Sequence, residues 1–120
     1  MPPRRPRQPE TFLPLTPVVF EILVTLAARE CHGYLILSDI RTRTGQTLRP
    51  GSLYRALNRL LDDGLVEELD ERPDPELDDE RRRYYRLSPL GRRVAEAEAA
   101  RLDIQVRSAR AAHLLERKRP

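Results

Sequence analysis

The chain is poor in the residues that catalytic and metal sites need. It has a single cysteine, Cys31, two histidines, His32 and His113, and no tryptophan. One cysteine excludes a disulfide within the chain, so nothing argues for secretion. No His/Cys cluster has the spacing of a zinc site, and neither a Ser/His/Asp set nor a Gly-rich phosphate loop is present. We therefore expect no enzyme, no metal site and no cofactor.

Long hydrophobic runs are also missing from the 120 residues. No apolar stretch approaches the roughly 20 residues that a membrane-spanning helix needs. The first residues lack the apolar core of a signal peptide. The sequence therefore predicts a cytoplasmic protein with no membrane partner, and its length predicts one domain with a modest core.

Lysine is almost absent, because 21 of the 22 basic residues are arginine. The net charge of +3 hides an uneven distribution: residues 1–60 carry +5, residues 61–80 carry −10 and residues 81–120 carry +8. Two basic blocks around an acidic one favour a polyanionic partner such as nucleic acid. The alternative is that the arginine content reflects only the base composition of the genome.

Proline and glycine divide the chain into segments. Residues 1–14 hold five of the eleven prolines, which predicts a disordered or extended Pro/Arg-rich arm. Thr16 and Pro17 are a good helix start, and helical apolar spacing continues to about Arg29. A second helix is expected from about Tyr34 to before Gly45, and a third from Pro50 to Gly64.

Two β-like pieces, residues 65–69 and 83–87, follow the third helix and could pair as a hairpin. Helix, glycine stop and hairpin in this order predict a winged helix-turn-helix, mainly α with a small β-hairpin. The predicted winged helix covers residues 15–87, of which 65–87 form the wing. Such a fold places a helix edge beside a β-arm against a nucleic-acid groove.

Ser88 and Pro89 open a long predicted C-terminal helix over residues 88–116, longer than so small a domain needs for itself. Its apolar residues follow the spacing of a helix–helix seam. We expect them to form a dimer interface, although the helix could instead fold back on its own domain. The predicted interface residues are Val94, Ala95, Ala99, Leu102, Val106, Ala109 and Leu114.

Four motifs in order resemble the PadR family of transcriptional regulators. They are HGY at residues 32–34, GSLYRAL at 51–57, GLV at 64–66 and RYYRLSPLG at 83–91. The resemblance covers residues 15–115. It implies a homodimer of winged helix-turn-helix units that binds an inverted repeat in double-stranded promoter DNA. It also implies a repressor, which in some members is released by a small molecule; the residues here identify no effector.

The third predicted helix carries the residues that we expect to bind DNA. Arg55 and Asn58 lie on one edge and can make bidentate contacts to guanine and adenine, although Asn58 could equally be an ordinary surface residue. Ser52 and Tyr54 can donate hydrogen bonds to phosphates, and Tyr54 could instead pack against the wing. Arg59 is expected to pair with Asp62 or Asp63.

Arginines at both flanks of this helix are further candidates. Arg49 precedes the helix-opening proline, where the family commonly has serine; arginine cannot cap the helix, which points to a phosphate contact. Arg81, Arg82 and Arg83 at the base of the hairpin could bind the DNA backbone. Arginines of the N-terminal arm, Arg4, Arg5 and Arg7, could enter a minor groove or remain a charged tail.

Seven acidic residues lie between the β-arms, in residues 70–80. Phosphates would repel this segment within a Debye length of about 8 Å. It could point away from DNA or fold onto the basic base of the hairpin, and it does not fit the EF-hand pattern of a metal loop. The acidic segment favours the alternative function, a winged-helix module that binds protein and not DNA.

Overall fold

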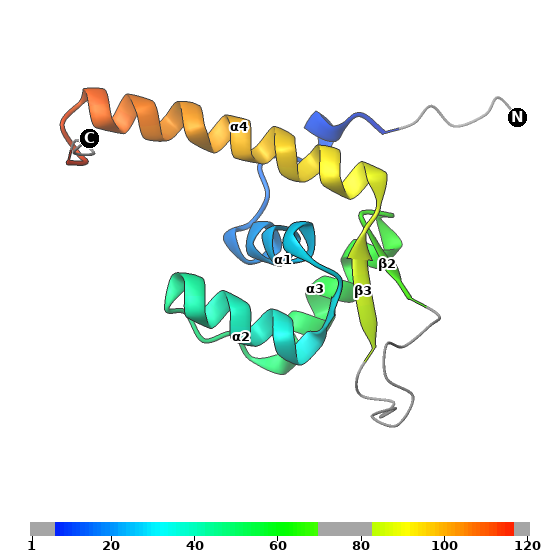
Figure 1. Cartoon of the computed structure of the whole chain (residues 1–120). Helices are drawn as coiled ribbons and strands as arrows, with labels where there is room; N and C mark the ends of the chain where they lie inside the picture. Colours follow the sequence, from blue (N-terminus) through cyan, green and yellow to red (C-terminus); the bar gives the residue numbers. More distant parts are fainter. Residues whose placement is uncertain (1–6, 70–82, 117–120) are drawn as a thin grey trace, which may run out of the picture.

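The computed structural model describes residues 7–69 and 83–116. Four α-helices and a small antiparallel sheet make up this part of the chain (Figure 1). The elements are η1 (Pro9–Phe12), α1 (Pro17–Ala28), β1 (Cys31–His32), α2 (Gly33–Thr44), α3 (Pro50–Asp62), β2 (Val66–Glu68), β3 (Tyr84–Leu87) and α4 (Pro89–Ala111). The predicted fold class, mainly α with a β-hairpin and a long C-terminal helix, is confirmed.

Local sequence signals set the ends of the helices. The Thr16 hydroxyl accepts a hydrogen bond from the Val19 N–H at 3.3 Å, and Pro17 occupies the first turn of α1. His32 caps α2, with its Nδ1 accepting from the Leu35 N–H at 3.2 Å. Gly45, at φ 73°, ends α2 in the left-handed conformation that glycine adopts without strain.

One hydrophobic core joins the three short helices to the sheet and to the first turns of α4. Each α-helix contributes the face that its apolar spacing predicts. The buried hydrophobic residues are Ile22, Leu23, Leu26, Cys31, Ile36, Ile40, Leu53, Leu57, Leu60, Leu65, Val66, Tyr85, Val94 and Ala95. α1 lies between α4 and the pair formed by α2 and α3 (Figure 1).

The sheet has the order β1-β3-β2 in the described residues, so the predicted hairpin gains a further strand. Cys31 and His32 pair antiparallel with Tyr85 and Tyr84 of β3. The sequence did not predict β1, because two residues are too short to show an alternating pattern. Cys31 is buried in this strand, and burial raises the pKa of its thiol to about 11, which disfavours the nucleophilic thiolate form.

The end of α3, the start of the wing and the start of α4 meet at one junction. The Ser88 hydroxyl donates to the Gly64 carbonyl at 2.6 Å and accepts from the Gly91 N–H at 2.9 Å. The Ser88 N–H donates to the Leu65 carbonyl at 3.1 Å. A Cβ on Gly91 would lie only 1.9 Å from that carbonyl oxygen, so the backbones of α4 and residue 65 are in direct contact.

The predicted arm over residues 1–14, disordered or extended, contains a short 3-10 helix, η1, and its residues 7–14 contact the domain; residues 1–6 lie outside the described part. η1 packs on α4, and Phe12 and Leu13 pack against the core. The Leu15 N–H donates to Oε2 of Glu98 at 2.6 Å. The proline content suggested disorder, but two apolar side chains and a buried carboxylate on α4 supply the contacts that order this segment.

α4 begins at Pro89 with Ser88 as its N-cap, as predicted, but its C-terminal end and the role of its first turns differ from the prediction. It ends at Ala111 and not near residue 116, because His113 adopts φ 63° and the Leu114 N–H bonds back to the Ala109 carbonyl at 2.9 Å, as in a Schellman motif. Val94 and Ala95 are only 0% and 9% exposed within their own chain. Their assignment to the dimer interface is therefore wrong: the first turns of the stripe cover their own domain.

The junction predicts that Gly91→Ala strongly destabilises the fold. The added methyl group would overlap a backbone oxygen, which can move only if α4 shifts, so we expect a loss of about 3 kcal/mol in the free energy of unfolding. Urea unfolding measures it. Gly51→Ala is the matched control: its Cβ meets nothing closer than an Arg55 side-chain atom at 3.9 Å, so we expect no loss. Equal stability of the two variants would contradict the described contact.

Glu98 predicts a pH-dependent contribution to stability. Its side chain is 1% exposed, and the hydrogen bond from Arg101, followed by that from the Leu15 N–H, holds its pKa below the usual range despite burial. A lowered folded pKa stabilises the fold above the ordinary value of about 4.3, and this stabilisation is lost as the pH falls through the folded pKa.

We therefore expect Glu98→Gln to lower the free energy of unfolding by about 2 kcal/mol at pH 7 and by clearly less at pH 3. Urea unfolding across this pH range measures the difference. The exposed Glu96 on the same helix provides the control, Glu96→Gln, for which no such difference is expected. A loss for Glu98→Gln that does not change with pH would show that the carboxylate charge has no part in holding the N-terminal segment.

Candidate nucleic-acid interface

α3 has a buried apolar edge and an exposed polar edge. Leu53, Leu57 and Leu60 point into the core, and Arg55 and Asn58 are exposed. The helix packs against α2 and β2 on its apolar side. The polar edge is thus left open on a helix that its own core holds firmly, which is the arrangement that a major groove can accept.

The start of α3 lacks a side-chain cap. Arg49 is the N-cap residue and accepts the backbone hydrogen bond of Leu53 at 3.0 Å, but its side chain makes no capping bond. The exposed N–H groups of this first turn carry the positive end of the helix dipole, and the Arg49 guanidinium adds to that charge. An anion would accept hydrogen bonds from these N–H groups and offset the positive charge, so this end of α3 suits a phosphate oxygen.

Ser52 and Arg55 lie together one turn into α3. Nη2 of Arg55 donates to the Ser52 hydroxyl oxygen at 3.3 Å, a long hydrogen bond between a half-buried serine and an exposed arginine. Asn58 is exposed on the same helix, three residues after Arg55. The three polar groups that the sequence predicted as DNA contacts are therefore brought onto one accessible surface.

Tyr54 mainly packs within the domain. A Cβ on Gly33 would lie 2.7 Å from the Tyr54 hydroxyl oxygen. The tyrosine therefore fits against the first residue of α2 because that residue has no side chain. Burial, followed by the nearby Tyr34, raises the pKa of Tyr54. The sequence left open that Tyr54 packs against the wing; in the structure it packs against α2. A contact from Tyr54 to DNA stays a prediction.

Each described arginine of the wing is paired with a glutamate across the hairpin. Nε of Arg86 lies 2.9 Å from Oε2 of Glu67, and Nε of Arg83 lies 3.5 Å from Oε1 of Glu68. Sequence reasoning missed these pairs, although the register of β2 on β3 places the residues opposite or diagonal to one another. Arg81, Arg82 and the acidic residues 70–80 lie outside the described residues.

The expected ion pair of Arg59 with Asp62 or Asp63 is not formed. Asp63 instead lies 3.7 Å from the Arg7 guanidinium, which reaches it from the N-terminal segment. Arg7 is therefore placed at the C-terminal end of α3 by this ion pair, and a contact from Arg7 to a minor groove stays a prediction. Arg4 and Arg5 lie outside the described residues.

The C-terminal half of α4 leaves apolar side chains uncovered. Ile104 is 64% exposed and Val106 is 39% exposed, and Leu114 beyond the helix is 77% exposed. Leu102 and Ala109 are half-buried on this helix, and Ala99 is exposed. At 3.6 residues per turn Ile104 lies about 200° around the helix from Val106, so Leu102, Val106 and Ala109 share one side of α4 and Ile104 lies on the other.

Within residues 7–69 and 83–116, no group of three or more His, Cys, Asp or Glu side chains is arranged to hold a metal ion. None of the helices in the same residues is long and apolar enough to cross a membrane.

Comparisons with known proteins agree with this geometry. The family model of the transcriptional regulator PadR-like family matches residues 22–97. A 37.1 kDa protein in transposon TN4556 of Streptomyces fradiae is 41% identical over 78 residues, or 65% of this chain. The matched part is 21% of that protein, so the chain spans about a fifth of its relative's length.

Solved structures share the fold. A PadR-like transcriptional regulator from Bacillus cereus has a TM-score of 0.71 at 18% identity, over 82% of this chain and 93% of that one. A PadR family transcription regulator from Clostridium difficile has a TM-score of 0.67 at 24% identity, over 78% of this chain and 95% of that one. Because the family model covers more than half of the residues, including α2, α3 and the start of α4, the chain belongs to the PadR-like family of transcriptional regulators.

Proposed function

We propose that this regulator binds double-stranded promoter DNA in a sequence-specific manner, as a homodimer that reads an inverted repeat and acts as a repressor. The observation that carries the proposal is the open polar edge of α3, with Arg49 at its uncapped start and Arg55 and Asn58 beyond it. Repression is the direction that the family resemblance implies.

Each residue of this edge has a role that its chemistry suits. Arg49 and the Ser52 hydroxyl bind phosphate oxygens at the start of the helix, where the dipole favours an anion. Arg55 and Asn58 reach the base edges, with the guanidinium on guanine and the amide on adenine. The bond of Arg55 to Ser52 is long enough, at 3.3 Å, to be exchanged for a base contact.

The wing contributes less than its arginine content suggested. Arg83 and Arg86 are each offset by a glutamate of β2, so the described part of the hairpin adds little net charge. Arg83 is 58% exposed and its pair is the longer one, which leaves it able to turn toward a phosphate. Contacts from Arg81 and Arg82 to the DNA backbone remain part of the proposal.

Dimer formation is proposed through the second half of α4. The 23 residues of the helix extend about 34 Å, and the residues fully buried in their own domain lie between Gly91 and Glu98. Ala99, Leu102, Val106 and Ala109 continue the same stripe beyond it, followed by Leu114. A two-fold axis through this region would place two α3 helices on one duplex, which is the geometry that reads an inverted repeat.

The DNA proposal predicts that Arg55→Ala and Asn58→Ala each weaken specific binding by about 1–3 kcal/mol, because each removes a bidentate base contact. Fluorescence anisotropy with duplex DNA from upstream of the gene, against scrambled DNA across a salt series, measures the loss. Arg93→Ala removes one positive charge from an exposed position on α4, outside the polar edge of α3, and serves as the control.

Unchanged affinity of both α3 variants would refute this contact assignment. If the unaltered protein bound neither duplex even at low salt, the proposal that it binds DNA would be refuted. The alternative, a winged-helix module that binds protein, would then be favoured by the glutamates of β2 and the acidic residues that follow.

Arg49→Ser separates stability from DNA binding. A serine hydroxyl can cap the N–H groups that Arg49 leaves unbonded, so we expect the free energy of unfolding to rise by about 1 kcal/mol. DNA affinity should fall, because a phosphate contact is lost, and the slope of log affinity against log salt should decrease by about 1. Anisotropy and urea unfolding test the two effects. A variant that is both more stable and tighter in binding would show that Arg49 has been misassigned.

Val106→Glu tests the dimer. In a two-fold assembly this substitution buries two like charges near each other, so we expect the dimer dissociation constant to rise at least about tenfold. Sedimentation equilibrium measures it. Ser108→Glu provides the control, because at 3.6 residues per turn Ser108 faces away from the stripe of Leu102 and Val106. Equal effects of the two substitutions would remove this stripe from the interface.

A further inference from the structure

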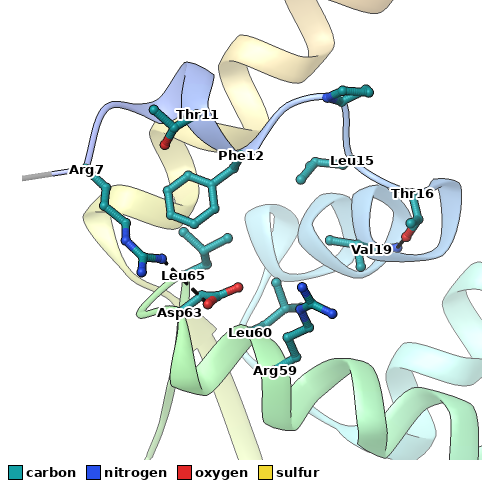
Figure 2. A pocket seen from close by; sticks show the side chains of 11 residues that line it. Arg7, Thr11, Phe12, Leu15, Thr16, Val19, Arg59, Leu60, Asp63 and Leu65 are labelled. Carbon is teal, nitrogen blue, oxygen red and sulfur yellow. Dashed lines mark hydrogen bonds and ion pairs between the residues drawn. The ribbon is translucent and has the colours of Figure 1, made fainter.

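A pocket lies between the N-terminal segment, the start of α1 and the end of α3 (Figure 2). Its volume is about 820 Å³, within the size range of small-molecule sites. Sequence reasoning did not find it, since its walls come from three separate parts of the chain. The pocket is lined by Arg7, Thr11, Phe12, Pro14, Leu15, Thr16, Val19, Arg59, Leu60, Asp63 and Leu65.

The N-terminal segment that closes one side of the pocket is anchored. The Leu15 N–H is bonded to the buried Glu98 of α4, and η1 packs on the same helix. Phe12 contacts the core. On the opposite side, Leu60 and Leu65 belong to the core itself. The pocket is therefore bounded by fixed parts of the domain and not by an open loop.

Two arginines and one aspartate supply its charges. Arg7 lies 3.7 Å from Asp63, so these two largely offset each other. Figure 2 shows the Arg59 side chain rising from α3 toward the pocket. In the described part of the chain Arg59 has neither an ion pair nor a side-chain hydrogen bond. One guanidinium is thus left to pair with an anion from outside.

The apolar walls are mostly aliphatic, formed by Leu15, Val19, Leu60 and Leu65. Phe12 is the aromatic residue of the lining, and the Arg7 guanidinium lies 5.6 Å from the centre of its ring. Arg7 therefore occupies a face of the ring on which a flat ligand would stack. The walls suit a flexible hydrocarbon body better than an aromatic one.

We propose that this pocket binds a small carboxylic acid with an aliphatic body, of the medium-chain fatty acid type, whose carboxylate pairs with Arg59. The hydrocarbon lies between Leu15, Val19 and Leu65, and the bidentate geometry of the guanidinium selects a carboxylate over an alcohol. The site goes beyond the proposed DNA contacts and does not depend on them, because its ligand binding can be measured without DNA.

The test is an NMR titration of the full chain with sodium octanoate, with octanol and octylammonium as neutral and cationic probes of equal length. We expect saturable shifts at Leu15, Val19, Leu60 and Leu65 with octanoate, and binding at least about tenfold weaker with octanol and octylammonium. Arg59→Met keeps the apolar stem and should weaken octanoate binding about tenfold. Arg93→Met, which removes a charge on α4, should leave it unchanged.

Several results would overturn the proposal. Octanoate shifts confined to the exposed residues of α4, equal binding of octanol, or an unaffected Arg59→Met variant would each do so. Tighter binding of benzoate than of octanoate would reject the aliphatic body. Shifts at the pocket residues that depend on protein concentration and not on octanoate would show that a second copy of the chain occupies the pocket.

Discussion

The contact of Ser88 and Gly91 with Gly64 and Leu65 is the constraint on which the remaining geometry depends. It holds three segments of the chain together: α3 ends at Gly64, the wing begins at Leu65, and Ser88 precedes the first residue of α4. The orientation of α3 relative to α4 is thus set by one hydrogen bond of the Ser88 hydroxyl, one backbone hydrogen bond of Ser88 and the close approach of Gly91 to Leu65. A residue larger than glycine at position 91 would separate the two helices.

α4 serves two purposes along one stripe. Near its start, Val94 and Glu98 are buried in the domain, and Glu98 also bonds the N-terminal segment at Leu15. Farther along, Leu102 and Val106 have no comparable cover. Because the same rigid helix carries both regions, a proposed partner chain on the second half would be held at a fixed position relative to the domain. The α3 helix of that partner chain would be held with it.

Sequence patterns predicted the helices and the hairpin because caps, glycine stops and apolar spacing are local signals. Thr16 and Ser88 lie at the starts of helices, where their hydroxyl groups cap a backbone N–H, and Gly64 lies at the end of α3. The missed features depend on residues that are distant in sequence: the pairing of Cys31 with β3, the binding of Leu15 to Glu98, and the preference of Asp63 for Arg7. Likewise, the apolar spacing of α4 could not tell Val94, which packs on its own domain, from Val106, which does not.

In the proposed assembly, two copies joined through α4 present two α3 helices to one duplex. Selection of bound sequences from a pool of random duplexes, using the full chain, tests this assembly. We expect enrichment of an inverted repeat whose half-sites lie about one helical turn of DNA, or a multiple of it, apart. Enrichment of a single half-site, or of no sequence at all, would contradict it.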